Sequence, residues 1–143
     1  MNVLDILLPL IRKSEGCKLK AYQCPAGIWT VGYGCTGKAI TKGVEWSQAE
    51  ADLALITCAK KTIDQALRAS PILIDYPSKT AAIADLIFNL GLGGYVGHSL
   101  KPLVDKGDWV EAASEILLFC RAGGKVLRGL QTRRTAEAKL LAS

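Results

Sequence analysis

Aromatic side chains and histidine are scarce in this chain. Phe, Trp and Tyr make up 6% of the 143 residues, and His98 is the single histidine. So few rings argue against a base-stacking platform for single-stranded nucleic acid. One imidazole, in a sequence without a Cys-x-x-Cys pair, argues against a structural zinc site. We therefore expect neither a metal nor a cofactor.

A long apolar segment is also missing. The run over residues 3–11 is interrupted by Asp5 and Pro9 and is too short to cross a bilayer. It lacks the basic start and the small-residue cleavage site of a secretory signal. We expect an amphipathic helix there, no stable membrane insertion, and a protein made in the cytoplasm without a signal peptide.

Length and charge leave several partner classes open. At 143 residues, with 50% hydrophobic and 22% charged residues, the chain suits one folded domain. Lys and Arg outnumber Asp and Glu by 18 to 13, a net charge of +5. A basic surface favours polyanions such as nucleic acid, anionic membrane or bacterial wall polymers, and charge alone does not choose among them.

Five cysteines, at positions 17, 24, 35, 58 and 120, are many for this length. Because the number is odd, at least one thiol stays free or pairs between chains. Cys58 and Cys120 fall in apolar helical patterns, which predicts small core residues.

Helix and strand signals divide the chain into an N-terminal helix, a β segment and a helical remainder. Cations followed by Gly16 predict a helix stop there, with Glu15 at or just past the helix C-terminus. β-formers and glycines over residues 17–36 predict a small antiparallel hairpin or meander. Ser47 and Glu50 form a capping-box pattern, Ser70-Pro71 and Tyr76-Pro77 mark a loop, and Ser78 is the predicted cap of a helix over 79–89. Further helices are expected at 99–106, 108–121 and 130–142, with a break at Gly123-Gly124.

This layout predicts an α+β, mostly helical fold with one small N-terminal antiparallel sheet. We expect a single domain over residues 1–143, with a sheet lobe at about 15–45. The helical lobe would comprise about 47–143 together with the N-terminal helix. A cleft between two lobes is where extended substrates bind.

Glu15 is a candidate general acid. Glycosidic bond cleavage needs a carboxyl that keeps its proton near neutral pH, and a second group that activates water or stabilises the oxocarbenium ion. Apolar or aromatic surroundings favour a protonated carboxyl, and Glu15 is followed by an aromatic hairpin. From residue types alone, most glutamates at such a position are solvated surface residues without a catalytic role.

Glu15 opens a pattern that resembles the phage-type lysozymes (endolysins) of glycoside hydrolase family 24. The pattern is Glu, eight residues, Asp or Cys, five residues, and a Thr within Thr-[Ile/Val]-Gly-x-Gly; here it gives Glu15, Cys24 and the string Thr30–Gly34. The likeness continues at residues 40–43, at the Ser-x-x-Glu helix start, at Phe88-Asn89-Leu90-Gly91, at Ser99-Leu100 and through 122–137.

The resemblance implies a two-lobed, lysozyme-like fold and an enzyme that cuts peptidoglycan, causing lysis. It implies hydrolysis between N-acetylmuramic acid and N-acetylglucosamine with inversion of configuration, which requires two separated groups that admit a water. Glu15 would be the acid, residue 24 would face the other side of the sugar, and Thr30 would hold the water. Phe88, Asn89 and Ser99 would line the saccharide groove.

The resemblance also implies partners and a place of action. Peptidoglycan strands would be the partner of a monomer, with no role for nucleic acid. An endolysin without a signal waits in the host cytoplasm until a holin opens the membrane, and then reaches the wall through the periplasm.

Two cysteines depart from the commonest family pattern. Cys24 stands where many relatives carry Asp; a thiol with an ordinary pKa of about 8.5 is a weaker base than a carboxylate unless activated. Cys24 is thus either a chemical partner of Glu15 or a packing residue. Cys35 stands where many relatives have His, a position expected to fix the hairpin to its surroundings. A disulfide among Cys17, Cys24 and Cys35 is possible, and one that involves Cys24 would block the site and make activity redox-dependent; the alternative is that all thiols stay reduced.

The same residues are also compatible with other interpretations and other functions. Phe88 and Asn89 also fit a helix end that packs in a core, and Arg133-Arg134 fits a core-docking and solvent-exposed pair. A lytic transglycosylase would cut the same bond with one glutamate. A non-catalytic wall-binding or nucleic-acid-binding module would need only the positive charge.

Overall fold

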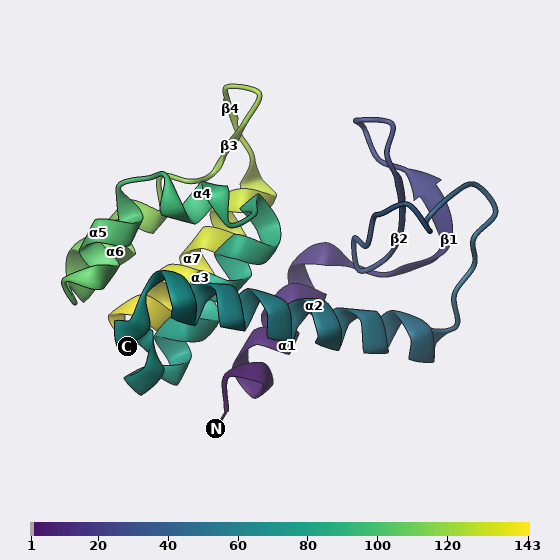
Figure 1. Cartoon of the computed structure of the whole chain (residues 1–143). Coiled ribbons are helices and arrows are strands. Elements are labelled where there is room, and N and C mark those ends of the chain that lie inside the picture. The colour runs from purple at the N-terminus through teal and green to yellow at the C-terminus, as the bar shows by residue number, and fades with distance from the viewer. Residues whose placement is uncertain (1) are drawn as a thin grey trace.

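A 22-residue helix, α2 (Gln48–Ala69), runs between a small sheet lobe and a larger helical lobe (Figure 1). The computed structural model describes residues 2–143. The predicted capping box starts this helix: the Ser47 hydroxyl accepts from the Glu50 N–H at 3.1 Å, and the Glu50 carboxylate accepts from the Ser47 N–H at 3.1 Å. Two otherwise unpaired N–H groups are thereby satisfied at the helix start.

The sheet lobe follows the first helix directly. Helix α1 (Val3–Glu15) ends at Gly16, whose φ of 64° suits a residue without a Cβ. Strands β1 (Lys18–Gln23) and β2 (Trp29–Gly32) pair antiparallel, with Tyr22 opposite Thr30 and an irregular register before it. The predicted helix end at Glu15 and the predicted hairpin are both confirmed.

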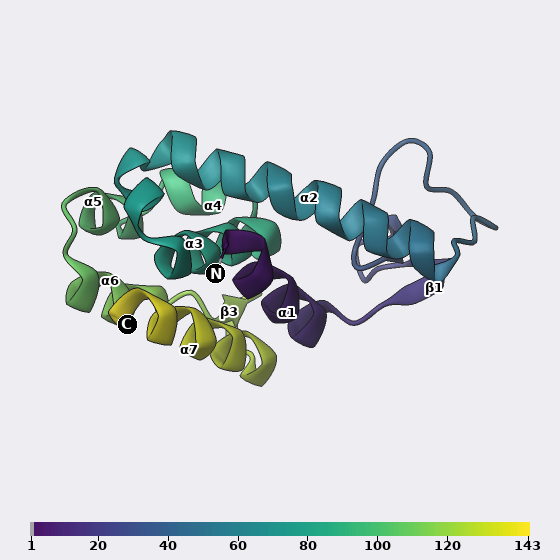
Figure 2. The same ribbon diagram turned by 90° about the horizontal axis from the view of Figure 1, so that it is seen from below.

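Helix α3 (Pro77–Leu90) forms the centre of the helical lobe, and residues 79–87 are all buried. Helices α1, α2 and α7 pack against it (Figure 2). The remaining elements are η1 (Pro71–Asp75), α4 (Gly93–Val96), α5 (Leu100–Asp105), α6 (Trp109–Ile116) and α7 (Arg128–Ala142). The mostly helical α+β fold class with its small N-terminal sheet is confirmed.

Three local predictions were wrong. Helix α6 ends at Ile116 rather than near 121, and a second hairpin, β3 (Arg121–Ala122) with β4 (Lys125–Val126), turns at two glycines of positive φ. Ser78 does not cap α3, because Pro77 takes the first helical position and Tyr76 precedes it. The loop expected between Ser70 and Pro77 is the short 3₁₀ helix η1.

Within residues 2–143, every helix is too short or too polar to cross a membrane.

Candidate active site

Glu15 lies where the helical lobe passes into the sheet lobe. It is the last residue of α1, and its side chain is 24% exposed. One carboxylate oxygen, Oε2, accepts a hydrogen bond from Arg133 Nη1 of α7 at 2.7 Å. The other, Oε1, faces the sheet lobe, 3.8 Å from where a Cβ on Gly34 would lie. The carboxyl is therefore held from one lobe and directed toward the other.

The guanidinium that holds Glu15 is itself fixed by a buried carboxylate. Arg133 Nε and Nη2 donate to the two oxygens of Asp85 at 3.0 and 2.8 Å, and Asp85 is fully buried in α3. Burial opposes the charged form of Arg133, but the hydrogen bonds and charges of Asp85 and Glu15 outweigh it and raise the pKa of the guanidinium. Such a two-pronged contact fixes the plane of the guanidinium.

Two further charged side chains extend this network into the core. Arg134 and Glu137 are both fully buried and form an ion pair at 2.7 Å. Burial raises the pKa of Glu137 well above its ordinary value; a hydrogen bond to Asp85 acts in the same direction, and the charge of Arg134 opposes it. The raised pKa favours the neutral form of Glu137.

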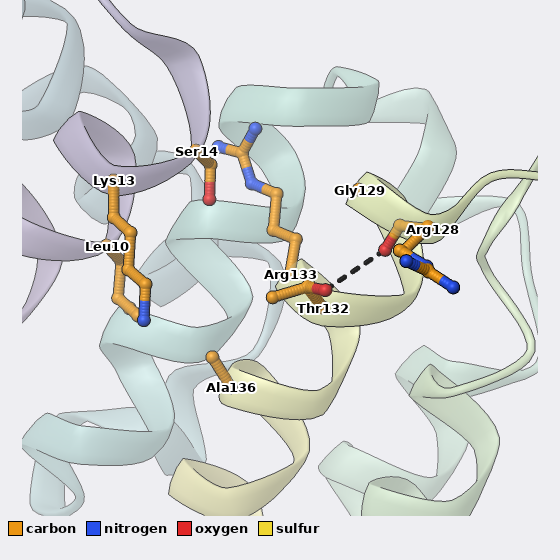
Figure 3. A pocket seen from close by; sticks show the side chains of 8 residues that line it. All are labelled: Leu10, Lys13, Ser14, Arg128, Gly129, Thr132, Arg133 and Ala136. Atoms are coloured by element: carbon orange, nitrogen blue, oxygen red, sulfur yellow. Dashed lines mark hydrogen bonds between the residues drawn. The ribbon is translucent and has the colours of Figure 1, made fainter.

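Figure 3 shows Arg133 reaching from α7 toward Ser14, the neighbour of Glu15 in the sequence. It borders a cavity of about 430 Å³ between α1 and α7. The position of Arg133 corrects the expectation of a partly solvent-exposed arginine pair, because Arg133 is 6% exposed and Arg134 is 0% exposed. Both side chains turn inward because buried carboxylates are available there.

The structure brings Cys24 and Thr30 together at the end of the β1–β2 hairpin. Cys24 follows β1, and its backbone pairs with Ile28 at 2.9 Å. Hydrogen bonds from the backbones of Ile28 and Ala26 lower the pKa of the Cys24 thiol; desolvation opposes them, and the Thr30 side chain assists. Thr30 is buried, and its hydroxyl donates to the Ile28 carbonyl at 3.0 Å.

Glu15 meets the same stretch of chain at Gly34, four residues beyond Thr30. The three residues of the sequence pattern thus lie on one hairpin and on the helix end beside it. Cys24 is half-buried rather than sequestered, so its thiol is open to small molecules.

The predicted groove residues differ in their surroundings. Phe88 is half-buried against the core at the end of α3. Asn89 Oδ1 accepts from Arg134 Nη2 at 2.9 Å, which joins Asn89 to the charged network. Ser99 is exposed, and its hydroxyl donates to Glu115 of α6.

All five cysteines carry free thiols. Cys120 is buried, as expected, but Cys58 is only half-buried, so its predicted core position is wrong. Cys58 of α2 contributes to the raised pKa of Cys35, whereas no other cysteine shifts the pKa of Cys24. Cys35 exchanges two backbone hydrogen bonds with Val31, each of 2.9 Å, within the hairpin. Its expected role in fixing the hairpin to its surroundings stays a prediction.

Sequence reasoning missed Asp85, the Arg133 contact with Glu15 and the Arg134–Glu137 pair. One signal was present: Asp85 interrupts an otherwise apolar run, Ala81–Ile87, in the middle of a helix. A lone carboxylate on a buried face requires a cationic partner.

Two lobes joined by one long helix, with a glutamate at their junction, define a lysozyme-like domain. The phage lysozyme family model matches residues 12–137. The chain therefore belongs to the phage lysozyme family.

Individual relatives agree with this assignment. The endolysin of Acyrthosiphon pisum secondary endosymbiont phage 1 is 36% identical, and the match covers 100% of this chain and 99% of the relative. The SAR-endolysin of Escherichia phage P1 is 34% identical over 93% of this chain and 77% of its own length. The crystal structure of the active form of P1 phage endolysin Lyz is 30% identical, covers 94% of this chain and 81% of its own, and has a TM-score of 0.75.

A more distant solved structure shares the fold. The muramidase domain of SpmX from Asticaccaulis excentricus has a TM-score of 0.81 at 24% identity, covering 94% of this chain and 93% of its own.

Replacing Glu137 by Gln should change how stability depends on pH. Because the folded-state pKa of Glu137 is raised, the folded state binds this proton more tightly than the unfolded state. The resulting stabilisation is fully present below the unfolded pKa of about 4.3 and is lost as pH rises through the folded pKa. Urea unfolding over that range should show the stability of the native protein falling, relative to Glu137→Gln, as pH increases.

The control is Glu111→Gln, at an exposed site on α6. Its stability should follow that of the native protein at every pH. A constant difference between the native protein and Glu137→Gln across the range would contradict the raised pKa.

Proposed function

We propose that this protein is an endolysin-type muramidase, which hydrolyses the β-1,4 bond between N-acetylmuramic acid and N-acetylglucosamine in peptidoglycan. The observation that carries the proposal is the fixed position of Glu15 between the lobes, at the family's acid position. Membership of the phage lysozyme family and the names of the relatives support the same activity.

Arg133 acts in this scheme as a positioning residue. It binds Oε2 of Glu15, so the proton for the leaving oxygen resides on Oε1, the oxygen that faces the sheet lobe. Asp85 prevents the guanidinium from rotating away. A carboxyl fixed in one orientation loses little entropy when the sugar chain arrives.

Cys24 and Thr30 would handle the attacking water. The Thr30 hydroxyl lies between the Ile28 carbonyl, to which it donates, and the Cys24 thiol, and its oxygen keeps a lone pair that accepts a hydrogen bond from water. The lowered pKa of Cys24 favours a thiolate, which accepts the proton that the water loses. Water then bonds to the anomeric carbon while Glu15 protonates the departing oxygen, a single displacement that inverts configuration.

Asn89 is the best-placed of the three proposed groove residues. Because Arg134 occupies its Oδ1, the amide NH₂ is the group left to donate to a sugar acetamido carbonyl. Phe88, half-buried beside it, offers apolar surface to a sugar ring. Ser99, engaged with Glu115, would lie further along the groove.

A lytic transglycosylase needs no group that activates a water molecule, because the substrate's own hydroxyl attacks the anomeric carbon. The pairing of Cys24 with Thr30 on the hairpin therefore favours hydrolysis. A purely binding module needs neither a fixed acid nor a buried network to hold it.

We further propose that the protein acts as a monomer on the wall after a holin-type lesion gives it access.

Replacing Glu15 by Gln should abolish clearing of a peptidoglycan suspension. Glutamine keeps the shape and a hydrogen bond to Arg133 but has no proton to give, so the initial rate should fall by roughly 10²–10⁴. Glu111→Gln should clear at the native rate. Circular dichroism and melting curves establish that both variants are folded; a folded Glu15→Gln protein that clears the suspension would refute the assigned acid.

Cys24 variants test the second group through the pH profile. A base must be deprotonated and the acid protonated, so activity should fall at low pH as the base gains a proton and at high pH as the acid loses its own. Cys24→Asp should stay active, with the low-pH limb moved to more acidic values, because the ordinary Asp pKa is about 3.9. Cys24→Ser, which cannot accept the proton, should lose at least about tenfold in rate. Native activity in Cys24→Ser would leave Cys24 as a packing residue.

A further inference from the structure

The cavity between α1 and α7 begins beside the proposed acid. Ser14, which precedes Glu15, and Arg133, which binds Glu15, both line it (Figure 3). Its volume of about 430 Å³ lies in the range of sites that hold small ligands. The catalytic scheme gives this space no role.

The walls of the cavity carry positive charge. Lys13 of α1 and Arg128 of α7 line it together with Arg133, and among the described residues no carboxylate does so. Within residues 2–143, neither Lys13 nor Arg128 forms an ion pair. A neighbouring cavity of about 350 Å³ shares Lys13 and Arg128 and adds Lys139. Cations that lack a partner around a hollow attract an anion.

Arg133 adds a rigid donor to these mobile cations. It is 6% exposed, and its contacts with Asp85 and Glu15 fix its plane. Those contacts use the Nε hydrogen and one hydrogen on each Nη nitrogen, so each Nη keeps a second hydrogen. A guanidinium hydrogen that is free at a cavity wall suits an oxyanion.

The start of α7 lies at the same cavity. Arg128 and Gly129 are the first two residues of the helix, and both line the cavity. Leu127 precedes them without a polar side chain that could cap the helix, and the first turn has no acidic residue. The N–H groups of that turn have no partner within the helix, and the helix dipole favours an anion beside them. The helix start therefore adds to the attraction of the cations.

The rest of the wall is apolar, which narrows the class of anion. Leu10 and Ala136 are half-buried and line the cavity. An inorganic anion gains nothing from apolar surface, whereas a carboxylate on a short aliphatic peptide uses both the apolar wall and the cations. The peptide stems of peptidoglycan combine alanine methyl groups with free carboxylates.

We propose that this cavity is a carboxylate subsite for the peptide stem of the N-acetylmuramic acid at the cleavage site. The inference rests on the proposed muramidase function, which places that sugar beside Glu15. An extended peptide advances about 3.5 Å per residue. A stem of a few residues therefore carries its carboxylates from the sugar into a cavity that begins at Ser14 and Arg133. The subsite distinguishes strands that carry stems from bare glycan.

The test compares soluble peptidoglycan strands that keep their stems with the same strands after an amidase has removed the stems. For the native protein, KM should be roughly three- to tenfold lower with stems than without. The value of kcat should not change, because the carboxylate binds away from the reacting atoms. The double variant Lys13→Gln/Arg128→Gln should lose the difference in KM, and added salt should reduce it in the native protein.

The matched control is Lys60→Gln/Lys61→Gln, which removes the same charge from exposed positions of α2. It should keep the native difference in KM. Equal KM values of the native protein for both kinds of strand would overturn the proposal. A Lys13→Gln/Arg128→Gln protein that keeps the difference, or a control that loses it, would overturn the proposal as well.

A binding measurement separates this proposal from the proposed function. Glu15→Gln keeps a hydrogen bond to Arg133 and should bind strands without cutting them. Calorimetry should show tighter binding of stem-bearing strands to Glu15→Gln, and adding Lys13→Gln and Arg128→Gln should remove this preference. A native protein that cuts neither kind of strand would refute the muramidase function, and the binding preference would still decide the subsite.

Inorganic phosphate serves as a probe of the anion site. It should compete with stem-bearing strands for Glu15→Gln, and this competition should disappear when Lys13 and Arg128 are also replaced by Gln. Phosphate binding without any preference for stem-bearing strands would indicate an adventitious anion site only, and would overturn the assignment to the peptide stem.

Discussion

The contact between Asp85 and Arg133 is the interaction on which the proposed site depends. Removing Arg133 would leave Asp85 buried without its cationic partner, at a cost of about 3–5 kcal/mol. While both are present, the guanidinium has one orientation, and its remaining nitrogen points at Glu15. The position of the acid at the end of α1 is therefore decided by residues of α3 and α7, the helices that pack against α1.

Burial within this cluster raises the pKa of Glu137 well above its ordinary value. Three carboxyl groups, those of Glu15, Asp85 and Glu137, meet two guanidinium groups, those of Arg133 and Arg134. The raised pKa favours the neutral form of Glu137, which lowers the cost of burying three carboxyl groups together. Asn89 accepts a further hydrogen bond from Arg134 and so joins the proposed sugar groove to the same network.

Local features of the fold followed from local sequence. The helix end at Glu15, the glycine-rich hairpin and the Ser47–Glu50 capping box each depend on residues a few positions apart, so their patterns sufficed. The end of helix α6 and the β3–β4 hairpin could not be predicted in this way, because two consecutive glycines indicate a helix break whether or not they form the turn of a second sheet, as Gly123 and Gly124 do.

Long-range pairings could not be predicted in the same way. Arg133 lies 118 positions from Glu15 and 48 from Asp85, so nothing local indicates that the three meet. The family resemblance supplied Glu15, Cys24 and Thr30 but not the residues that hold the acid. Those depend on how α7 packs against α1 and α3, which side-chain volumes decide jointly over the whole core.

The most direct measurement of the central claim is mass spectrometry of the muropeptides that the native protein releases from purified peptidoglycan. If Glu15 donates the proton while water attacks, the products end in a reducing N-acetylmuramic acid that carries the added water. Products that end in 1,6-anhydro-N-acetylmuramic acid would mean that the substrate's own hydroxyl attacks, and the hydrolytic account would be wrong.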